Sequence, residues 1–235
     1  MKFGPYSLRH ELKFYIRYPE YVGLRERLKR VLAPDKHTVD EDGYHIRSLY
    51  FDNMYETALI DKVNGIFKRK KYRVRIYNIE DKIIRLERKS RYGEYVNKIG
   101  ATLSKEQYAM LCEGEVDFMR GSDVQLFRDF YLDNASAKLS PTVIVDYVRE
   151  AYVFPISDVR ITFDKRLCSS VNSLDIFDKQ LVTASVVKEP MLIMEVKYNQ
   201  FLPQHINDLL NIESHNRSAI SKYVLCRQVR KSFAD

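Results

Sequence analysis

The stretch KKYRVRIY, residues 70–77, alternates charged and apolar side chains, and IIRLERKSR, residues 83–91, repeats the pattern. The charged positions two residues apart are Arg73 and Arg75 in the first run and Arg85, Glu87, Lys89 and Arg91 in the second. A β-strand directs alternate side chains to opposite faces, so each run lines one surface with charge and the other with apolar groups. Strands of this kind side by side predict a basic wall or channel, and an anion with many phosphates is the ligand that suits it.

The same two-residue spacing recurs further along the chain. It is seen at Tyr147 and Arg149, at Arg160, Thr162 and Asp164, and at Glu195 and Lys197. The solvated face of an antiparallel sheet also carries cations, but it usually mixes Lys with Glu, Thr and Ser. These positions favour arginine, whose planar fork binds phosphate oxygens two at a time. Taken together, the strands favour an anion site over a solvated face.

Two carboxylates, Glu87 and Glu195, lie in phase with the cations on their own strands. Each of the two carboxylates is either an ion-pair partner of the neighbouring cations or a metal ligand. The divalent cations that accompany triphosphates take oxygen ligands, and one or two protein carboxylates are often enough. Both interpretations stay open from the residues alone.

Composition limits the class of protein without choosing its ligand. The 235 residues contain 39 basic and 32 acidic side chains, a net charge of +7 that favours an anionic partner. Cys112, Cys168 and Cys226 show no C-x-x-C spacing and are expected to be buried thiols in a reducing compartment rather than redox or metal sites. No segment resembles a signal peptide or a membrane span, so we expect a cytoplasmic protein.

Hydrophobic spacing and turn signals give the expected elements. Strands are expected at 8–16, 44–52, 65–77, 83–90, 94–103, 142–154, 159–168, 181–187 and 191–198. Helices are expected from Pro19 to the stop at Pro34, in a short stretch through residue 60, and at 105–112, 122–137, 203–212 and 221–231. Strands outnumber helices and no linker is visible. The sequence therefore predicts a single α+β domain, residues 1–235, on a largely antiparallel sheet that closes on itself.

Several common catalytic motifs are absent from the sequence. It contains eight glycines but no G-x-x-x-x-G-K-[ST] and no G-x-G-x-x-G, and it lacks H-E-x-x-H, paired C-x-x-C and G-x-S-x-G. This speaks against zinc hydrolases and acyl-transfer enzymes. If the protein handles phosphates, side-chain cations rather than a backbone loop must hold them.

A series of motifs adds up to a family resemblance. In chain order they are RHELKF (9–14), YHIRSLYFD (44–52), KYRVRIYN (71–78), LERK (86–89), VNKIG (96–100), PTVIVDYVREAY (141–152), VRITFDKRL (159–167), MEVKY (194–198) and ISKY (220–223). Together they resemble the catalytic domain of the vacuolar transporter chaperone (VTC) polyphosphate polymerases, which are triphosphate tunnel metalloenzymes related to the CYTH phosphatases. The resemblance covers residues 9–228.

This resemblance implies a tunnel of eight antiparallel strands surrounded by helices. It implies transfer of the ATP γ-phosphate to a growing polyphosphate chain with Mn²⁺ or Mg²⁺. Matched motif by motif, it places Lys13, Arg73, Arg75, Lys89, Lys98, Arg149, Arg160, Ser221 and Lys222 around the phosphates. Glu195 matches the glutamate that holds the metal.

We combine the resemblance with the alternation to assign roles. Catalytic roles go to Arg73, Arg75, Lys89, Arg149, Arg160 and Lys222. Substrate binding goes to Lys13, Lys98, Lys197, Ser221 and Glu87, and metal binding to Glu195.

The chain departs from the family in two places. Some members carry a lysine three positions before Lys222, where this chain has Ala219. The CYTH phosphatases have E-x-E-x-K in the first strand, whereas here only Glu11 precedes Lys13, which weakens the hydrolase interpretation. The chain shows no SPX-like region and no membrane helix, so we expect synthesis that is not coupled to translocation through this chain.

Two alternatives remain. One is a triphosphatase acting on tripolyphosphate, thiamine triphosphate or a nucleotide; the other is a non-catalytic module that binds polyphosphate or nucleic acid. Tyr50, Tyr72, Tyr77 and Tyr147 resemble a base-stacking platform, although they suit a core equally well. The run from Lys68 to Lys71 is expected to be a solvated tunnel rim. We expect ATP and inorganic polyphosphate or pyrophosphate as partners and no nucleic acid, with any membrane partner protein unknown.

Overall fold

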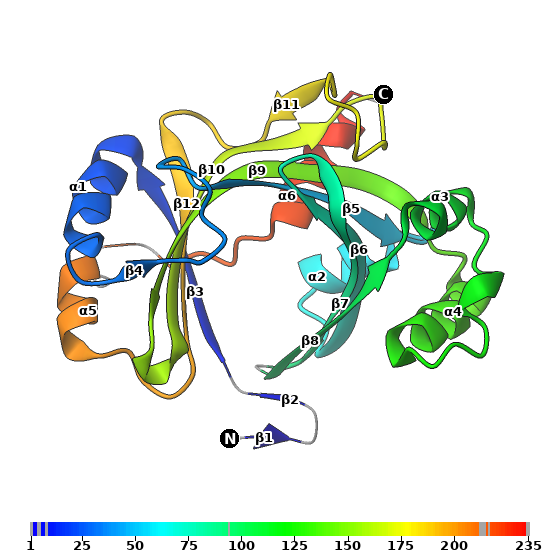
Figure 1. Ribbon diagram of the computed structural model, residues 1–235, viewed down its shortest axis with the longest axis horizontal. Helices are drawn as coiled ribbons and strands as arrows, with labels where there is room; N and C mark the ends of the chain where they lie inside the picture. Colours follow the sequence, from blue (N-terminus) through cyan, green and yellow to red (C-terminus); the bar gives the residue numbers. More distant parts are fainter. Residues whose placement is uncertain are drawn as a thin grey trace.

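The structure is a computed structural model that describes residues 2–3, 6–7, 9–93, 95–211, 215 and 217–233. One antiparallel sheet dominates it. Its eight long strands are β3 (His10–Arg17), β5 (Tyr44–Asp52), β6 (Lys68–Tyr77), β7 (Glu80–Tyr92), β8 (Tyr95–Leu103), β9 (Ser140–Phe154), β10 (Val159–Ser170) and β12 (Met191–Tyr198). They are neighbours in the order β8-β7-β6-β5-β9-β10-β12-β3, and the sheet curves into an arch (Figure 1). Shorter strands at its margins are β1 (Lys2–Phe3), β2 (Tyr6–Ser7), β4 (Ala33–Pro34) and β11 (Thr183–Ser185).

The two edges of the arch, β8 and β3, are joined through the N-terminal chain. Ser7 in β2 pairs with Val96 in β8, and β3 begins three residues later at His10. Within the described residues no ladder pairs β3 directly with β8. The eight-stranded antiparallel sheet that we expected is therefore present, and its edges are linked by the chain rather than by a ladder of their own.

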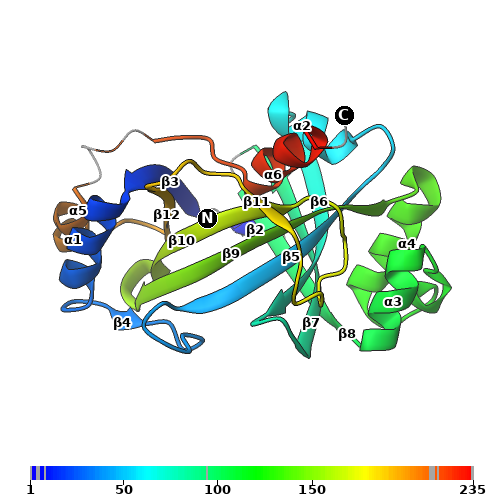
Figure 2. The same cartoon turned by 90° about the horizontal axis from the view of Figure 1, so that it is seen from above.

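Six α-helices surround the sheet in the described parts of the chain. They are α1 (Tyr18–Leu28), α2 (Thr57–Val63), α3 (Lys105–Glu113), α4 (Gln125–Ala137), α5 (Gln204–Leu210) and α6 (Lys222–Lys231), with 3-10 turns at Asp117–Met119 and Ile156–Asp158. Helices α1 and α5 lie outside one limb of the arch, and α3 and α4 outside the other (Figure 1). Helix α6 packs on β9 and β10, and α2 packs on α6 and β6, so both lie toward one end of the arch (Figure 2). None of the described helices is long and apolar enough to cross a bilayer.

Alternation along β6 explains how one strand serves two faces. Tyr72, Val74 and Ile76 are buried in a core that includes residues of α3 and α4. The ring of Tyr72 meets Phe130 of α4 edge-on, with centroids 4.9 Å apart. The intervening arginines therefore point to the concave side of the arch, which we call the inner face.

The expected elements are largely confirmed, with three corrections. Helix α1 ends at Leu28 rather than before Pro34, because Ala33 and Pro34 pair with β9 instead. The strand expected at 181–187 shrinks to β11, since it pairs only with the last residues of β10 after a bulge. All three cysteines are free, but only Cys226 is buried, while Cys112 and Cys168 are half-buried. Leu8, Glu94 and Ile212, which we placed in expected elements, lie outside the described residues.

Gly43, just before β5, has a backbone that only glycine tolerates well. Its φ is +106°, and a Cβ there would lie 2.1 Å from the carbonyl oxygen of Arg149. We expect Gly43→Ala to lower the free energy of unfolding by roughly 2–3 kcal/mol in urea denaturation. Gly65→Ala is the matched control: its φ is +67° but nothing lies within 4 Å of the new Cβ, so a loss of about 1 kcal/mol is expected. Equal losses in the two variants would contradict the close approach at Gly43.

Candidate functional site

The ladders bring the alternating charges of the sheet onto the inner face. Residues directly paired in an antiparallel ladder project to the same side. The paired positions are Arg73 with Glu87, Arg75 with Arg85 and Ser48, Lys89 with Lys98, Arg149 with Asp164, Arg160 with Lys197, Glu195 with Lys13, and Lys197 with Glu11. Charged side chains from β3, β6, β7, β8, β9, β10 and β12 thus share one concave surface.

The first group of contacts centres on Glu87 in β7. Its carboxylate accepts hydrogen bonds from Arg73 at 2.8 Å and 2.7 Å and contacts Lys98, while Arg75 lies 4.0 Å away. Burial alone would raise the pKa of the Glu87 carboxyl, but attraction to Arg73, Arg75 and Lys98 holds it well below its usual range. Burial lowers the pKa of Lys98 to about 8. Glu87 is therefore an ion-pair partner that orients Arg73, which favours that interpretation over a metal ligand.

Arg75 is buried but has no hydrogen bond to a carboxylate in the described residues. Its Nε donates to Ser48 Oγ at 3.0 Å and its Nη2 to the hydroxyl of Tyr147 at 3.3 Å. These neutral acceptors fix the guanidinium without neutralising it. The guanidinium of Arg75 is therefore preorganised to bind an anion on the inner face.

The second group centres on Asp164 in β10, which is 1% exposed. Arg149 binds both of its oxygens at 2.7 and 2.8 Å, and Lys222 at the start of α6 approaches to 2.5 Å. Burial would raise the pKa of Asp164, but attraction to Arg149 and Lys222 lowers it to about 2. Asp164 was not among the predicted site residues. Its spacing, two residues after Thr162 and four after Arg160, was the signal that pointed to it.

The third group joins the two limbs of the arch. Lys13 lies 3.8 Å from Glu11 and 3.6 Å from Glu195, and Lys197 lies 3.6 and 3.0 Å from the same two carboxylates. Lys89 in β7 reaches across to Glu11 in β3, with its Nζ 3.1 and 3.2 Å from the two oxygens. Burial would raise the pKa of Glu195, but attraction to its lysine neighbours keeps it well below the ordinary value. Glu11, which we had noted only as a departure from the phosphatases, is therefore a central residue.

The start of α6 adds Ser221 and Lys71 to the site. Lys71 Nζ donates to Ser221 Oγ at 3.3 Å and lies 4.7 Å from the ring centroid of Tyr223. The prediction of a solvated rim was wrong for Lys71, because it is in phase with Arg73 and faces inward. Lys70, on the opposite face, is the exposed residue and pairs with Asp133.

Arg160 lies apart from these groups. Its Nη2 is 2.7 Å from Asp35 and 2.9 Å from the hydroxyl of Tyr44, which is the ladder partner of Arg149. Its Nε is buried without a hydrogen-bond partner. Arg160 thus borders the site through Tyr44 instead of contacting the central carboxylates.

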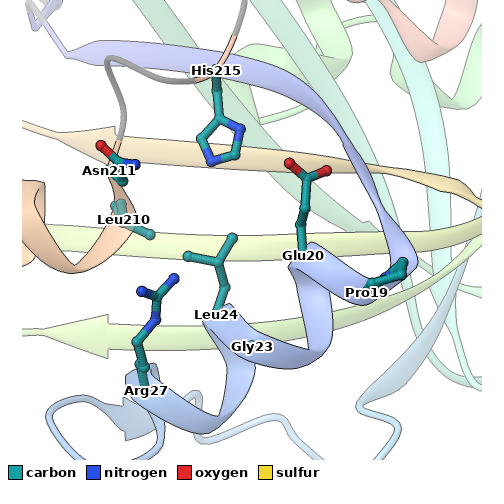
Figure 3. A pocket seen from close by; sticks show the side chains of 8 residues that line it. All are labelled: Pro19, Glu20, Gly23, Leu24, Arg27, Leu210, Asn211 and His215. Atoms are coloured by element: carbon teal, nitrogen blue, oxygen red, sulfur yellow. The ribbon is translucent and has the colours of Figure 1, made fainter.

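One groove of the structure lies away from this site. A groove of 480 Å³ lies between α1 and the end of α5, where Glu20, Leu24 and Arg27 face Leu210 and His215 (Figure 3). A smaller pocket of 270 Å³ lies on the inner face, lined by Tyr77, Arg85, Glu87, Lys98, Ile99 and Gly100. Of these two, the groove between α1 and α5 is larger, but the pocket on the inner face is the one that adjoins the convergent cations.

Glu195 and Glu11 are the carboxylates best placed for a divalent cation. Within the described residues no group of three or more His, Cys, Asp or Glu side chains forms a complete metal cage. Mg²⁺ and related ions are often bound by one or two carboxylates together with substrate phosphates and waters. The donor set fits a metal ion of that kind.

The chain belongs to the VTC domain family, whose model matches residues 8–230. This family lies within the triphosphate tunnel metalloenzymes, whose members are mostly enzymes. No protein among those with curated functions matches the chain.

Solved structures that resemble the fold include two putative adenylate cyclases. A putative adenylate cyclase from Bacillus halodurans is 13% identical with a TM-score of 0.54, covering 92% of this chain and 95% of its own. A putative adenylyl cyclase from Hippeastrum with a dominant triphosphatase activity is 13% identical with a TM-score of 0.52, covering 94% and 97%. At these identities the likeness concerns the fold alone, and that fold is CYTH-like.

Asp164 offers a test of how the inner face is held together. Asp164→Asn removes the closest carboxylate from Arg149 and Lys222, and Glu195, 3.7 Å from Arg149, compensates only part of their charge, so we expect the free energy of unfolding at pH 7 to fall by about 3 kcal/mol. Because the folded pKa of Asp164 is depressed, its contribution is present above the ordinary value of 3.8 and lost as the pH falls toward about 2.

Urea denaturation over that pH range measures the difference between wild type and variant. Asp81→Asn, which removes an exposed ion pair with Lys105, is the control and should leave stability unchanged. A difference between wild type and Asp164→Asn that persists undiminished at pH 2 would show that the charge of Asp164 is not responsible.

Proposed function

We propose that the protein is a metal-dependent polyphosphate polymerase that transfers the γ-phosphate of ATP to a growing chain of inorganic polyphosphate. The observation that carries this proposal is the convergence of cations from seven strands and α6 around a few buried carboxylates. Membership of the VTC domain family supports it. Its partners would be ATP and polyphosphate or pyrophosphate, in the cytoplasm where ATP is available.

The proposal includes a tunnel formed by a single domain. The chain connection from Ser7 to His10 and the contact of Lys89 in β7 with Glu11 in β3 support closure, since both link the two limbs of the arch. A closed sheet would surround the substrate with donors from every side and exclude competing water.

Phosphoryl transfer needs positioning and charge stabilisation more than covalent chemistry by the protein. Arg73, Arg75, Arg149 and Arg160 would hold the phosphates, and Lys13, Lys89, Lys98, Lys197, Ser221 and Lys222 would complete the cage. Their ion pairs and hydrogen bonds already fix most of these donors before a ligand arrives. Such preorganised charges cost no rearrangement during the reaction and stabilise charge that develops in the transition state.

The carboxylates have distinct proposed roles. Glu87 and Asp164 orient Arg73 and Arg149, whereas Glu195, with Glu11, would hold Mn²⁺ or Mg²⁺. When bound, the metal ion would neutralise charge on the bridging phosphate oxygens. The acceptor phosphate oxygen is already anionic at neutral pH, so no histidine general base is required at the site.

A tunnel triphosphatase is the second candidate, because water in place of the acceptor phosphate would use the same residues. The Hippeastrum protein with a similar fold has a dominant triphosphatase activity, and this supports the triphosphatase as the second candidate. A nucleic-acid module is less well supported, since Tyr50, Tyr72 and Tyr147 are all buried and offer no stacking platform.

The decisive assay incubates the protein with ATP and Mn²⁺ and separates the products on a polyacrylamide gel. A polymerase produces a ladder of long phosphate chains and ADP. A triphosphatase releases short phosphate products without chains. Binding of polyphosphate with neither product would leave only the non-catalytic module.

Glu195→Gln tests the proposed metal ligand. The amide is a neutral ligand, so we expect metal-dependent turnover of ATP to fall by about 100-fold or more. Glu80→Gln is the control, because Glu80 lies at the start of β7 and, among the described residues, forms an ion pair with exposed Lys82 alone. Near-normal turnover by Glu195→Gln over a titration of Mn²⁺ would refute the role of Glu195.

A further inference from the structure

Helix α2 and the turns on either side of it expose a concentration of large apolar side chains. Nineteen large apolar side chains are exposed among the described residues, and six of them lie between Met54 and Phe67. These six, which we call the α2 patch, are Met54, Tyr55, Ile60, Val63, Ile66 and Phe67. Single apolar residues on a surface need no explanation, but a contiguous patch indicates a surface that binds something.

The local structure brings the α2 patch together. Helix α2 has seven residues, which is about 10 Å at the rise of an α-helix, so the turns at its two ends lie close to each other. Ile60 and Val63 are three residues apart and therefore share one side of the helix. After α2 the amide of Ile66 donates to the carbonyl of Asp61 at 2.9 Å, which turns the chain back toward the helix. Leu59 is the residue that α2 buries in the core.

The α2 patch lies on a projecting part of the molecule. Figure 2 shows α2 standing out from the sheet beside the C-terminal end of α6. Met54 is 82% exposed, Phe67 69% and Val63 63%. Neither of the two grooves described above is lined by a residue of the patch. Apolar side chains that project in this way are able to enter the boundary between the headgroups and the acyl chains of a lipid surface.

The cations around the α2 patch suit an anionic surface. Lys62 lies within α2, Lys68 directly follows Phe67, and Arg69 donates to the carbonyl of Ile66 at 2.5 Å. In the part of the chain that the structure describes, neither lysine forms an ion pair within 4 Å. A lysine beside apolar residues lays its aliphatic stem on them and extends its ammonium group toward lipid headgroups.

The acidic side chains of this segment already have cationic neighbours. Glu56 binds Arg227 and Lys231 of α6, and Asp61 attracts Arg69. Residues 54–69 contain three basic and two acidic side chains, and α6 adds its two cations beside Glu56. A partner that matches this segment is therefore negatively charged at its surface and apolar beneath it. A bilayer with anionic lipids has both properties.

We infer that the α2 patch docks the protein on an anionic lipid surface. The apolar side chains of the patch enter the boundary below the headgroups, and Lys62, Lys68 and Arg69 contact the lipid phosphates. One patch of this size gives a peripheral, reversible attachment. It holds the α2 end of the arch against the lipid. The inference does not rest on the proposed function, because none of these residues belongs to the three groups of contacts on the inner face.

Sedimentation with lipid vesicles tests the inference. The full chain is mixed with vesicles of phosphatidylcholine, either alone or with about one third phosphatidylserine, and we expect binding to the mixed vesicles only. Met54→Ser/Val63→Ser removes two apolar side chains and should weaken partitioning by about tenfold. Lys68→Ala should weaken it by about fivefold, the worth of one cation near an anionic surface.

Matched controls change similar side chains elsewhere on the surface. Leu132→Ser removes an exposed apolar side chain from α4, and Lys82→Ala an exposed cation at the start of β7. Both should bind vesicles like the wild type. Tripolyphosphate in every sample competes for the cations of the inner face, so that those cations do not hold the headgroups. Thermal unfolding of each variant verifies that it is folded.

The chain contains no tryptophan, which gives an independent readout. Met54→Trp places a single fluorophore in the α2 patch. Its emission should shift to shorter wavelength with mixed vesicles and be quenched by lipids that are brominated on their acyl chains. Leu132→Trp, on α4, should show neither effect. Quenching requires that the side chain enters the lipid, which electrostatic adsorption alone does not produce.

Four results overturn the inference. They are no binding of the wild type to mixed vesicles, an equal loss of binding in Leu132→Ser, unchanged binding in Met54→Ser/Val63→Ser, and a wild-type dimer that Met54→Ser/Val63→Ser converts to a monomer in sedimentation velocity. The last result would assign the patch to a second copy of the chain. Failure of the proposed function shows differently, as an absence of polymer in the ATP assay, because vesicle binding needs no turnover.

Discussion

The inner face depends on the attraction between a few buried carboxylates and a larger number of cations. Glu87, Asp164 and Glu195 each contact at least two positive side chains from different elements. Without these contacts, the strands would bring guanidinium and ammonium groups together with nothing to offset their repulsion. With them, the cations are fixed in position but remain in excess. Such a surface is compatible with a stable fold but keeps an excess of positive charge. A strongly anionic ligand would neutralise that excess.

The local part of the fold was readable from the sequence because the side-chain period of a strand is a local property. The alternation in residues 70–77 placed Arg73 and Arg75 on one face and Val74 and Ile76 on the other, and the structure agrees. Which cations meet which carboxylates was not readable. The contact of Lys89 with Glu11 joins residues 78 positions apart and arises from the curvature of the whole sheet. Lys71 was misjudged because a run of basic residues hides the alternation, and the same phase that places Arg73 inward also places Lys71 there.

The arrangement divides the inner face into regions of different chemistry. Around Glu195 and Glu11, carboxylates and lysines are mixed, which suits a metal ion with its phosphate oxygens. Toward α2, the hydrogen-bond acceptors of Arg69, Lys71 and Arg91 among the described residues are neutral oxygens.

The most direct test is a crystal structure of the protein with a non-hydrolysable ATP analogue and Mn²⁺. The account predicts triphosphate density on the concave side of the arch, within hydrogen-bonding distance of Arg75 and Arg149, with the metal ion at Glu195. Triphosphate bound instead in the groove between α1 and α5 or on the outer surface, with the inner cations still paired only with the protein's own carboxylates, would contradict it.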